Sequence, residues 1–202
     1  MNITITGMTG SGKSYFARHM IAQSIKPIYA LADNIHDLEE LEKVTGRELN
    51  LVRVGKNTVV KEIPQNTAMV FENVIYSEIE ETIDYICSYL YDQGNSIFYV
   101  DEAHIFFPNR NIGKSPRELE RLLRGGRKKG IDVIMVTQRP QDLNLIAISQ
   151  SHFLIAFKSA ERNTIKVIAE NMMVDPDVIL KLGRYEALIY DTTSGEIDKY
   201  KF

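Results

Sequence analysis

The 202-residue sequence predicts one α/β domain spanning residues 1–202, built on a mostly parallel sheet with helices on both faces and a C-terminal hairpin. Two observations predict this class. Apolar, β-branched runs alternate along the chain with segments whose apolar residues recur at helical spacing, which is the order of a parallel sheet. In addition, no repeat or low-complexity linker divides the chain, and its length suits one well-buried core.

The first half of the chain alternates regularly between the two patterns. A β-branched run at 2–6 indicates a strand, and residues 13–24 indicate a helix. A short apolar run at 27–32 predicts the second strand, and the helical pattern at 35–45 ends at Gly46. We expect further strands at 49–54 and 68–71, then a helix at 77–91 whose acidic face is solvated.

The second half continues the alternation. A continuous apolar run predicts a strand at 96–100, and Ser115, Pro116 and Glu118 form an N-cap, a first-turn proline and a capping box. We expect the helix that they begin to run to about Arg124. Strands are predicted at 131–136 and 153–157, and helices at 162–171 and 176–182. Strands at 185–191 and 196–202, on either side of a turn at 193–195, predict the hairpin.

Composition limits the classes of function and the compartment. The net charge of −3 argues against binding nucleic acid over the whole surface, but it leaves local basic patches open. The single cysteine, Cys87, has no internal disulfide partner, and we expect it to be a small buried apolar group. The chain starts directly on a strand, and no apolar run approaches the roughly 20 residues of a membrane span. We therefore expect a cytoplasmic protein without a membrane segment.

Residues 7–14 contain the strongest motif, Gly-Met-Thr-Gly-Ser-Gly-Lys-Ser, which matches G-x-x-x-x-G-K-[ST] at every position. The glycines allow successive backbone N–H groups to turn inward around a polyphosphate. Lys13 supplies a charge for the β/γ oxygens, and the Ser14 hydroxyl is a ligand for Mg²⁺. The motif predicts that ATP is bound by Gly7, Met8, Thr9, Gly10, Ser11, Gly12, Lys13 and Ser14.

The apolar strand at 97–100 delivers Asp101 and Glu102, in the form of a Walker B element. Asp101, at the carboxyl end of the strand, suits the shell of the Mg²⁺ ion, and Glu102 is the candidate base that polarises the attacking water. Residues 101–104 also spell Asp-Glu-Ala-His, a helicase box. Helicases that carry this box need two recombinase-like lobes, and this chain has room for one. We expect His104 to be a structural histidine whose hydrogen bonds are satisfied.

A third candidate group follows in the chain. Gln138 lies just beyond the predicted strand at 131–136, at its carboxyl end. There it could sense the γ-phosphate or hold the water. Upstream, Arg127 lies in a glycine-flanked turn, and arginine suits transition-state charge on a phosphoryl group. The segment 110–129 carries eight basic and two acidic residues, so it is the one local patch able to meet phosphate, or else a solvated basic helix.

Together, residues 7–14, residues 97–102, and the Gly126-Arg127 pair ahead of a strand ending in Thr137-Gln138 resemble the HerA/FtsK superfamily of ring-forming, DNA-pumping ATPases. Within it, the likeness is greatest to small viral and phage genome-packaging ATPases. The resemblance covers about residues 3–157. It implies a recombinase-like P-loop NTPase domain, a hexameric or pentameric ring around double-stranded DNA, and an arginine given in trans to the neighbour's nucleotide. By position Arg127 is that arginine, with Arg124 as the alternate.

These expectations combine into an Mg²⁺-dependent, ATP-hydrolysing DNA translocase, with a capsid or portal component as a further partner and the host cytoplasm or virion vertex as its location. Lys13, Glu102, Gln138 and Arg127 are its expected catalytic residues. Two alternatives remain open at this stage. One is a morphogenesis ATPase of the zonula-occludens-toxin type that exports filamentous virions. The other is a small-molecule kinase, although kinases generally lack a glutamate directly after the Walker B aspartate.

Overall fold

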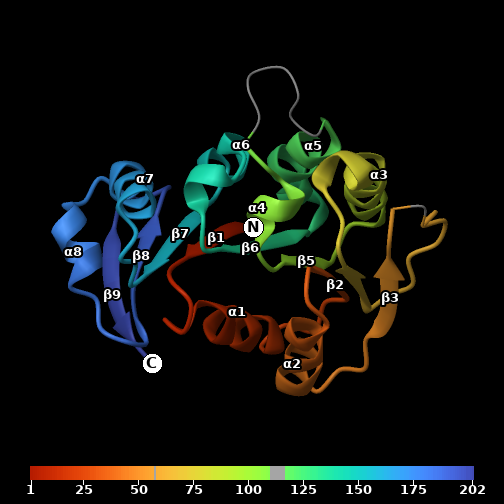
Figure 1. Ribbon diagram of the computed structural model, residues 1–202, viewed down its shortest axis with the longest axis horizontal. Coiled ribbons are helices and arrows are strands. Elements are labelled where there is room, and N and C mark those ends of the chain that lie inside the picture. The colour runs from red at the N-terminus through yellow and green to blue at the C-terminus, as the bar shows by residue number, and fades with distance from the viewer. Residues whose placement is uncertain (57, 110–116) are drawn as a thin grey trace.

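The computed structural model describes residues 1–56, 58–109 and 117–202, and in them nine strands form one sheet with helices on both faces (Figure 1). The strands are β1 (Asn2–Thr6), β2 (Ile28–Ala32), β3 (Asn50–Val54), β4 (Thr67–Phe71), β5 (Ile97–Val100), β6 (Asp132–Thr137), β7 (Phe153–Phe157), β8 (Glu186–Asp191) and β9 (Ile197–Lys201). The helices are α1 (Lys13–Ala22), α2 (Ile35–Thr45), α3 (Tyr76–Gln93), α4 (Ala103–Phe106), α5 (Arg117–Gly125), α6 (Leu145–Ser149), α7 (Arg162–Met172) and α8 (Pro176–Leu180). Two 3₁₀ turns, η1 (Gly126–Lys129) and η2 (Pro140–Asp142), complete the described elements.

The strand order β3-β4-β2-β5-β6-β1-β7-β8-β9 is parallel from β3 through β7. The last two strands add an antiparallel hairpin, so the predicted fold class is confirmed. Strand β6 lies between β1 and β5. Because parallel strands end at the same edge of a sheet, the segments that follow β1, β5 and β6 lie side by side.

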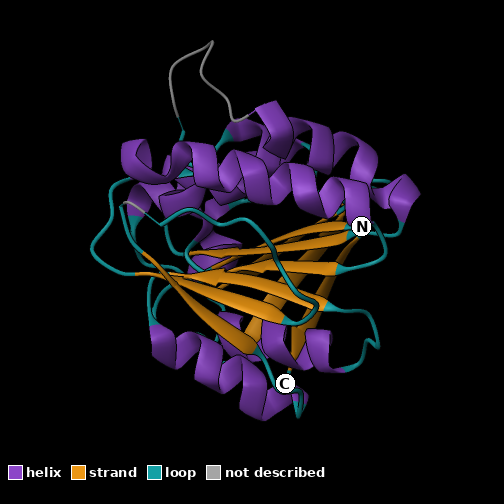
Figure 2. Ribbon diagram, turned by 90° about the vertical axis from the view of Figure 1, so that its right-hand side faces the viewer, coloured by secondary structure: helices purple, strands orange, loops and turns teal. Residues whose placement is uncertain are grey.

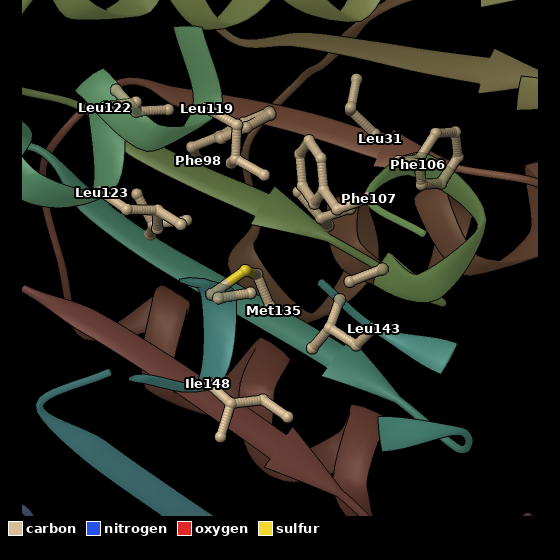
Figure 3. Packing of buried hydrophobic residues seen from close by; sticks show 14 of the residues in the cluster. Leu31, Phe98, Phe106, Phe107, Leu119, Leu122, Leu123, Met135, Leu143 and Ile148 are labelled. Carbon is tan, nitrogen blue, oxygen red and sulfur yellow. The ribbon is translucent and has the colours of Figure 1, made fainter. Parts of the chain in front are cut away.

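Two apolar layers hold the sheet between the helices (Figure 2). Helices α1 and α2 cover one face, where Ile5, Ala17 and Leu41 are fully buried. The other helices pack on the opposite face, where Phe98, Phe107 and Leu122 belong to a larger cluster (Figure 3). Since successive side chains of a strand point to opposite faces, Tyr99 packs toward α1 while Phe98 packs toward α5.

Most predicted elements lie within one or two residues of the observed ones, and the predicted helix at 35–45 and strand at 153–157 match α2 and β7. Cys87 is buried, as expected, and burial raises the pKa of its thiol well above the usual value. The expected helix at 13–24 ends earlier, at Ala22, and Ser115 and Pro116 lie outside the described residues. Arg127 lies in a 3₁₀ turn that continues from α5, rather than in an open glycine turn. No described helix is long and apolar enough to cross a bilayer.

Candidate active site

The loop between β1 and α1 has the backbone that its glycines predict. Gly12 has a φ of +110° as the residue that caps α1, and Gly7 has a φ of +154°. A Cβ on Gly7 would lie 2.6 Å from the Phe157 Cβ, so the loop is packed too closely against β7 for any side chain there. The Ser11 hydroxyl is buried without a hydrogen-bond partner in the described part of the chain. An orphaned polar group in a loop of this form fits a bound polyphosphate.

Glu102 and Gln138 meet at the end of the sheet, beside this loop. The backbone N–H of Gln138 donates to the Glu102 Oε2 at 3.2 Å, and its side-chain amide donates to Oε1 at 2.5 Å. The Gln138 Oε1 in turn accepts a 2.7 Å hydrogen bond from the Thr9 hydroxyl. Lys13 Nζ lies 3.8 Å from Glu102 Oε1 and is almost buried. A carboxylate, an amide and an ammonium group therefore surround the mouth of the loop.

The backbone of Glu102 is itself unusual. Its φ of +45° and ψ of +52° place it in the left-handed region, where residues with a side chain are uncommon. Such positions cost free energy and persist where the surrounding structure fixes them, often at functional sites. Here the turn between β5 and α4 directs the carboxylate toward Gln138 and Lys13.

Asp101 has a different environment from its neighbour. It is 3% exposed, and its Oδ2 accepts a 2.6 Å hydrogen bond from the Tyr99 hydroxyl and lies 3.5 Å from the Arg18 guanidinium. Its Oδ1 accepts the Glu102 N–H at 3.1 Å. Burial raises the Asp101 pKa to about 6, although the Tyr99 hydrogen bond and the Arg18 charge oppose that shift. The sequence reasoning did not anticipate Arg18, which also pairs with Asp37 and Glu40 on α2.

This pattern of contacts bears on the expected magnesium ligands. No group of three or more carboxylate, histidine or cysteine side chains gathers as a metal cage in the described ranges. Mg²⁺ needs no such cage, because it usually takes one or two protein oxygens together with phosphates and water. The oxygens of Ser14, at the first turn of α1, and of Asp101 are ligands of the kind that Mg²⁺ takes. In this structure one Asp101 oxygen already contacts Arg18 and Tyr99.

His104 is paired, as expected for a structural histidine. Its Nδ1 lies 3.0 Å from the Thr137 hydroxyl and 3.4 Å from Glu102 Oε2. Burial lowers the pKa of His104, although the neighbouring Glu102 carboxylate acts in the opposite direction. The hydrogen bond of His104 is therefore with Thr137 on β6.

The family of the chain follows from its sequence as a whole. A family model described as zonular occludens toxin (Zot) matches residues 1–148, about three quarters of the chain. This chain belongs to the Zot family. The matched range contains the phosphate loop, Glu102, Arg127 and Gln138, so the Zot-family region of the chain includes every predicted site residue.

The resemblance of this Zot-family chain to HerA/FtsK-like P-loop ATPases is also confirmed. A protein of Methanocaldococcus jannaschii described as "Probable DNA double-strand break repair helicase HerA" is 24% identical over 182 residues, which are 87% of this chain and 29% of that protein. The chain spans less than a third of the length of the curated relatives that it matches.

Solved structures show the same fold over almost the whole chain. The genome packaging NTPase B204 from Sulfolobus turreted icosahedral virus 2, in complex with AMP, has a TM-score of 0.74 and 20% identity and covers 99% of this chain and 96% of its own. VirB4 of Thermoanaerobacter pseudethanolicus has a TM-score of 0.72 and 10% identity and covers 100% and 89%. The recombinase-like P-loop architecture is thus shared across this class.

In this Zot-family chain, the turn η1, which carries Arg127, lies at the opposite end of β6 from Gln138. Arg121 pairs with Glu118 and Asp92, and Arg124 pairs with Glu120 at 2.8 Å. Arg127 is exposed, and no described residue forms an ion pair with it. Because β6 has six residues at about 3.3 Å each, Arg127 is roughly 20 Å or more from the Gln138 of its own chain. Arg127 is therefore not brought to the site of its own chain, and part of the predicted basic face is neutralised.

Proposed function

We propose that this protein is a subunit of an ATP-hydrolysing motor that moves double-stranded DNA, and that it packages a viral genome. One observation carries the proposal: the Glu102 carboxylate, fixed by Gln138, lies beside Lys13 of the phosphate loop. A carboxylate at this place suits the activation of water, which a motor needs and a small-molecule kinase must avoid.

In the proposed reaction, ATP lies along the phosphate loop with its γ-phosphate toward Glu102. Lys13 stabilises charge on the β/γ oxygens, and the N-terminus of α1 adds its partial positive charge. Glu102 accepts a hydrogen bond from the attacking water and orients it, while Gln138 holds Glu102 and senses the γ-phosphate. The water oxygen bonds to the γ-phosphorus as the bond from that phosphorus to the bridging oxygen breaks, a water proton passes to Glu102, and ADP and phosphate leave.

A magnesium ion bound with the nucleotide would be held by the Ser14 hydroxyl and by Asp101, and it would supply positive charge to the phosphates. Arg127 would complete the site from the next subunit of a hexameric or pentameric ring, since it lies far from its own loop. A ring is the assembly that repeated head-to-tail contacts of this kind produce. The protein would act in the host cytoplasm or at the virion vertex, together with a capsid or portal component.

The Zot family model supports a second candidate, an ATPase that drives export of filamentous virions. That function would use the same nucleotide chemistry and the same arginine in trans. It differs in what is moved, because an export motor acts on a virion with its coat rather than on bare duplex DNA. We favour packaging because the fold of the B204 packaging NTPase matches this chain with a TM-score of 0.74, against 0.50 for the N-terminal domain of zonular occludens toxin from Neisseria meningitidis.

The test is phosphate release from Mg·ATP by the full chain, with and without linear double-stranded DNA, using Lys13→Ala as the inactive control. The proposal expects turnover without any metabolite and a several-fold rise with DNA. Turnover that is indifferent to DNA would favour export. Transfer of phosphate to a small acceptor with no release to water would contradict both motors.

A further inference from the structure

Tyr185, in the turn between α8 and β8, has an unusual backbone conformation. Its φ of +61° is left-handed, which is uncommon for a bulky residue. Both of its backbone groups are held, because its N–H donates to the Ser11 carbonyl at 3.1 Å and its carbonyl accepts the Phe202 N–H at 3.0 Å. The C-terminal hairpin therefore fixes Tyr185 directly against the phosphate loop.

The side chain lies on the loop as well. A Cβ built on Gly12 would be 2.8 Å from the Tyr185 Cδ1, so the ring occupies the space beside that glycine. The Arg184 guanidinium lies 4.8 Å from the centre of the ring. On the other side, Tyr15 of α1 is 55% exposed. These groups line an open pocket whose walls are Gly10, Gly12, Lys13, Ser14, Tyr15, Arg184 and Tyr185.

The pocket shares Lys13 with the reacting groups but not the two residues that follow β5 and β6. Its walls include neither Glu102, which lies 3.8 Å from Lys13, nor Gln138, which meets the loop through Thr9. A triphosphate whose γ-phosphate faces Glu102 must extend its remaining part past Ser14 and Tyr15. The part of ATP that reaches the walls formed by Tyr15, Arg184 and Tyr185 is therefore the α-phosphate and the nucleoside.

We propose that Arg184 and Tyr185 form the nucleoside subsite, with the base stacked on the Tyr185 ring and Arg184 paired with the α-phosphate. This inference rests on the proposed binding of ATP and extends it to two residues near the C-terminus. Tyr185 is 37% exposed as a residue, and its aromatic ring is a flat apolar surface suited to a base. The Arg184 guanidinium suits both stacking and phosphate pairing. The conformation of Tyr185 is then maintained because it places the ring beside Gly12.

The experiment compares binding of Mg·ATP with binding of inorganic triphosphate, both by calorimetry on the full chain. Tyr185→Ala should weaken ATP about tenfold, since stacking on an aromatic ring contributes about that factor or more, and should leave triphosphate unchanged. Tyr185→Gly, which tolerates the left-handed φ, should behave like Tyr185→Ala if the fold is kept. Tyr185→Phe should bind ATP normally. Arg184→Ala should weaken both ATP and triphosphate, because inorganic triphosphate also has a phosphate at the α position.

The matched control is Tyr85→Ala, because Tyr85 is 38% exposed on α3 and remote from the loop. An ATP affinity within about twofold of the wild type in Tyr185→Ala and Tyr185→Gly would overturn the subsite. Equal loss of ATP and triphosphate in the Tyr185 variants would also overturn it, because Tyr185 would then only support the loop. A wild type that binds neither ligand would instead refute the proposed ATPase itself.

Discussion

The side-chain amide of Gln138 donates a hydrogen bond to the carboxylate of Glu102, joining the ends of the adjacent strands β6 and β5. Both residues follow buried strands, so the position of each is fixed by the sheet. The hydrogen bond also leaves Glu102 within 3.8 Å of Lys13. The relationship makes the carboxylate the centre of the proposed hydrolysis, and the first two predictions concern this pair.

Glu102→Gln should reduce the rate of phosphate release by about a hundredfold or more, because an amide does not polarise water as a carboxylate does. The affinity for Mg·ATP should stay within about twofold, since the phosphates are bound by the loop. Steady-state phosphate release and calorimetry measure the two quantities. Glu120→Gln on the surface of α5 is the control and should be unchanged. Normal turnover in Glu102→Gln would exclude the assigned base.

Gln138→Ala should lower kcat about tenfold or more without weakening ATP binding. The substitution frees Glu102 from its amide partner and lets the carboxylate approach Lys13, so the water is no longer held correctly. Single-turnover phosphate release separates this chemical step from product release. Gln141→Ala, whose side chain accepts a hydrogen bond from Thr164 instead, provides a nearby comparison. An unchanged kcat in Gln138→Ala would contradict the sensing role.

The stability of the nucleotide-free protein should depend on pH through Asp101, whose folded pKa is about 6. Because this pKa is raised above the unfolded value, the contribution of Asp101 to stability is fully present below about pH 4. It is lost as the pH rises through 6. Relative to Asp101→Asn, the wild type should therefore lose up to about 3 kcal/mol of unfolding free energy between pH 4 and 7.

Urea unfolding at several pH values measures this difference, with the asparagine variant as the reference that does not titrate at this position. The difference should level off above about pH 7, where Asp101 is ionised in both states. A difference that instead grew in favour of the wild type as the pH rose would mean that the Arg18 charge outweighs burial.

Arg127→Ala should lose about a hundredfold or more in kcat, and mixing it with Lys13→Ala subunits should restore part of the activity. The reason is geometric: the Lys13→Ala subunit still presents an arginine, and the Arg127→Ala subunit still has an intact loop. Phosphate release by the mixture, compared with each variant alone, measures the effect. Arg124→Ala is the matched variant and should stay near normal, since Arg124 pairs with Glu120. A mixture no more active than its parts would refute action in trans.

Much of the fold could be predicted because periodic burial leaves a clear signal over five or more residues. Helix α2 shows this, with Leu38 and Leu41 buried and charged residues between them. Helices α4 and α6 were missed because four or five residues are too short to show a helical period. Helix α8 is equally short, but Pro176 marks its first turn. The turn η1 was missed for a different reason. Two glycines after a helix are compatible both with an open turn and with a 3₁₀ continuation of the helix.

The site was predictable in its parts but not in its contacts. Motifs at the carboxyl ends of predicted strands identified Lys13, Glu102 and Gln138 as candidates. That these residues lie close together depends on β6 lying between β1 and β5. Sequence spacing does not specify that order. Tyr185 gave no signal at all, because an antiparallel strand far along the chain brings it to the loop.

The position of β6 has one further consequence. Strand β6 is hydrogen-bonded on both sides and buried on both faces, so it is expected to move only together with the rest of the sheet. One tip carries Gln138 and the other leads from the turn that carries Arg127. In the proposed ring, release of phosphate beside Gln138 would therefore be transmitted to the next subunit as a rotation of the whole sheet. The step size of the proposed motor would then be set by how far the sheet rotates as a rigid body, and not by how far a loop bends.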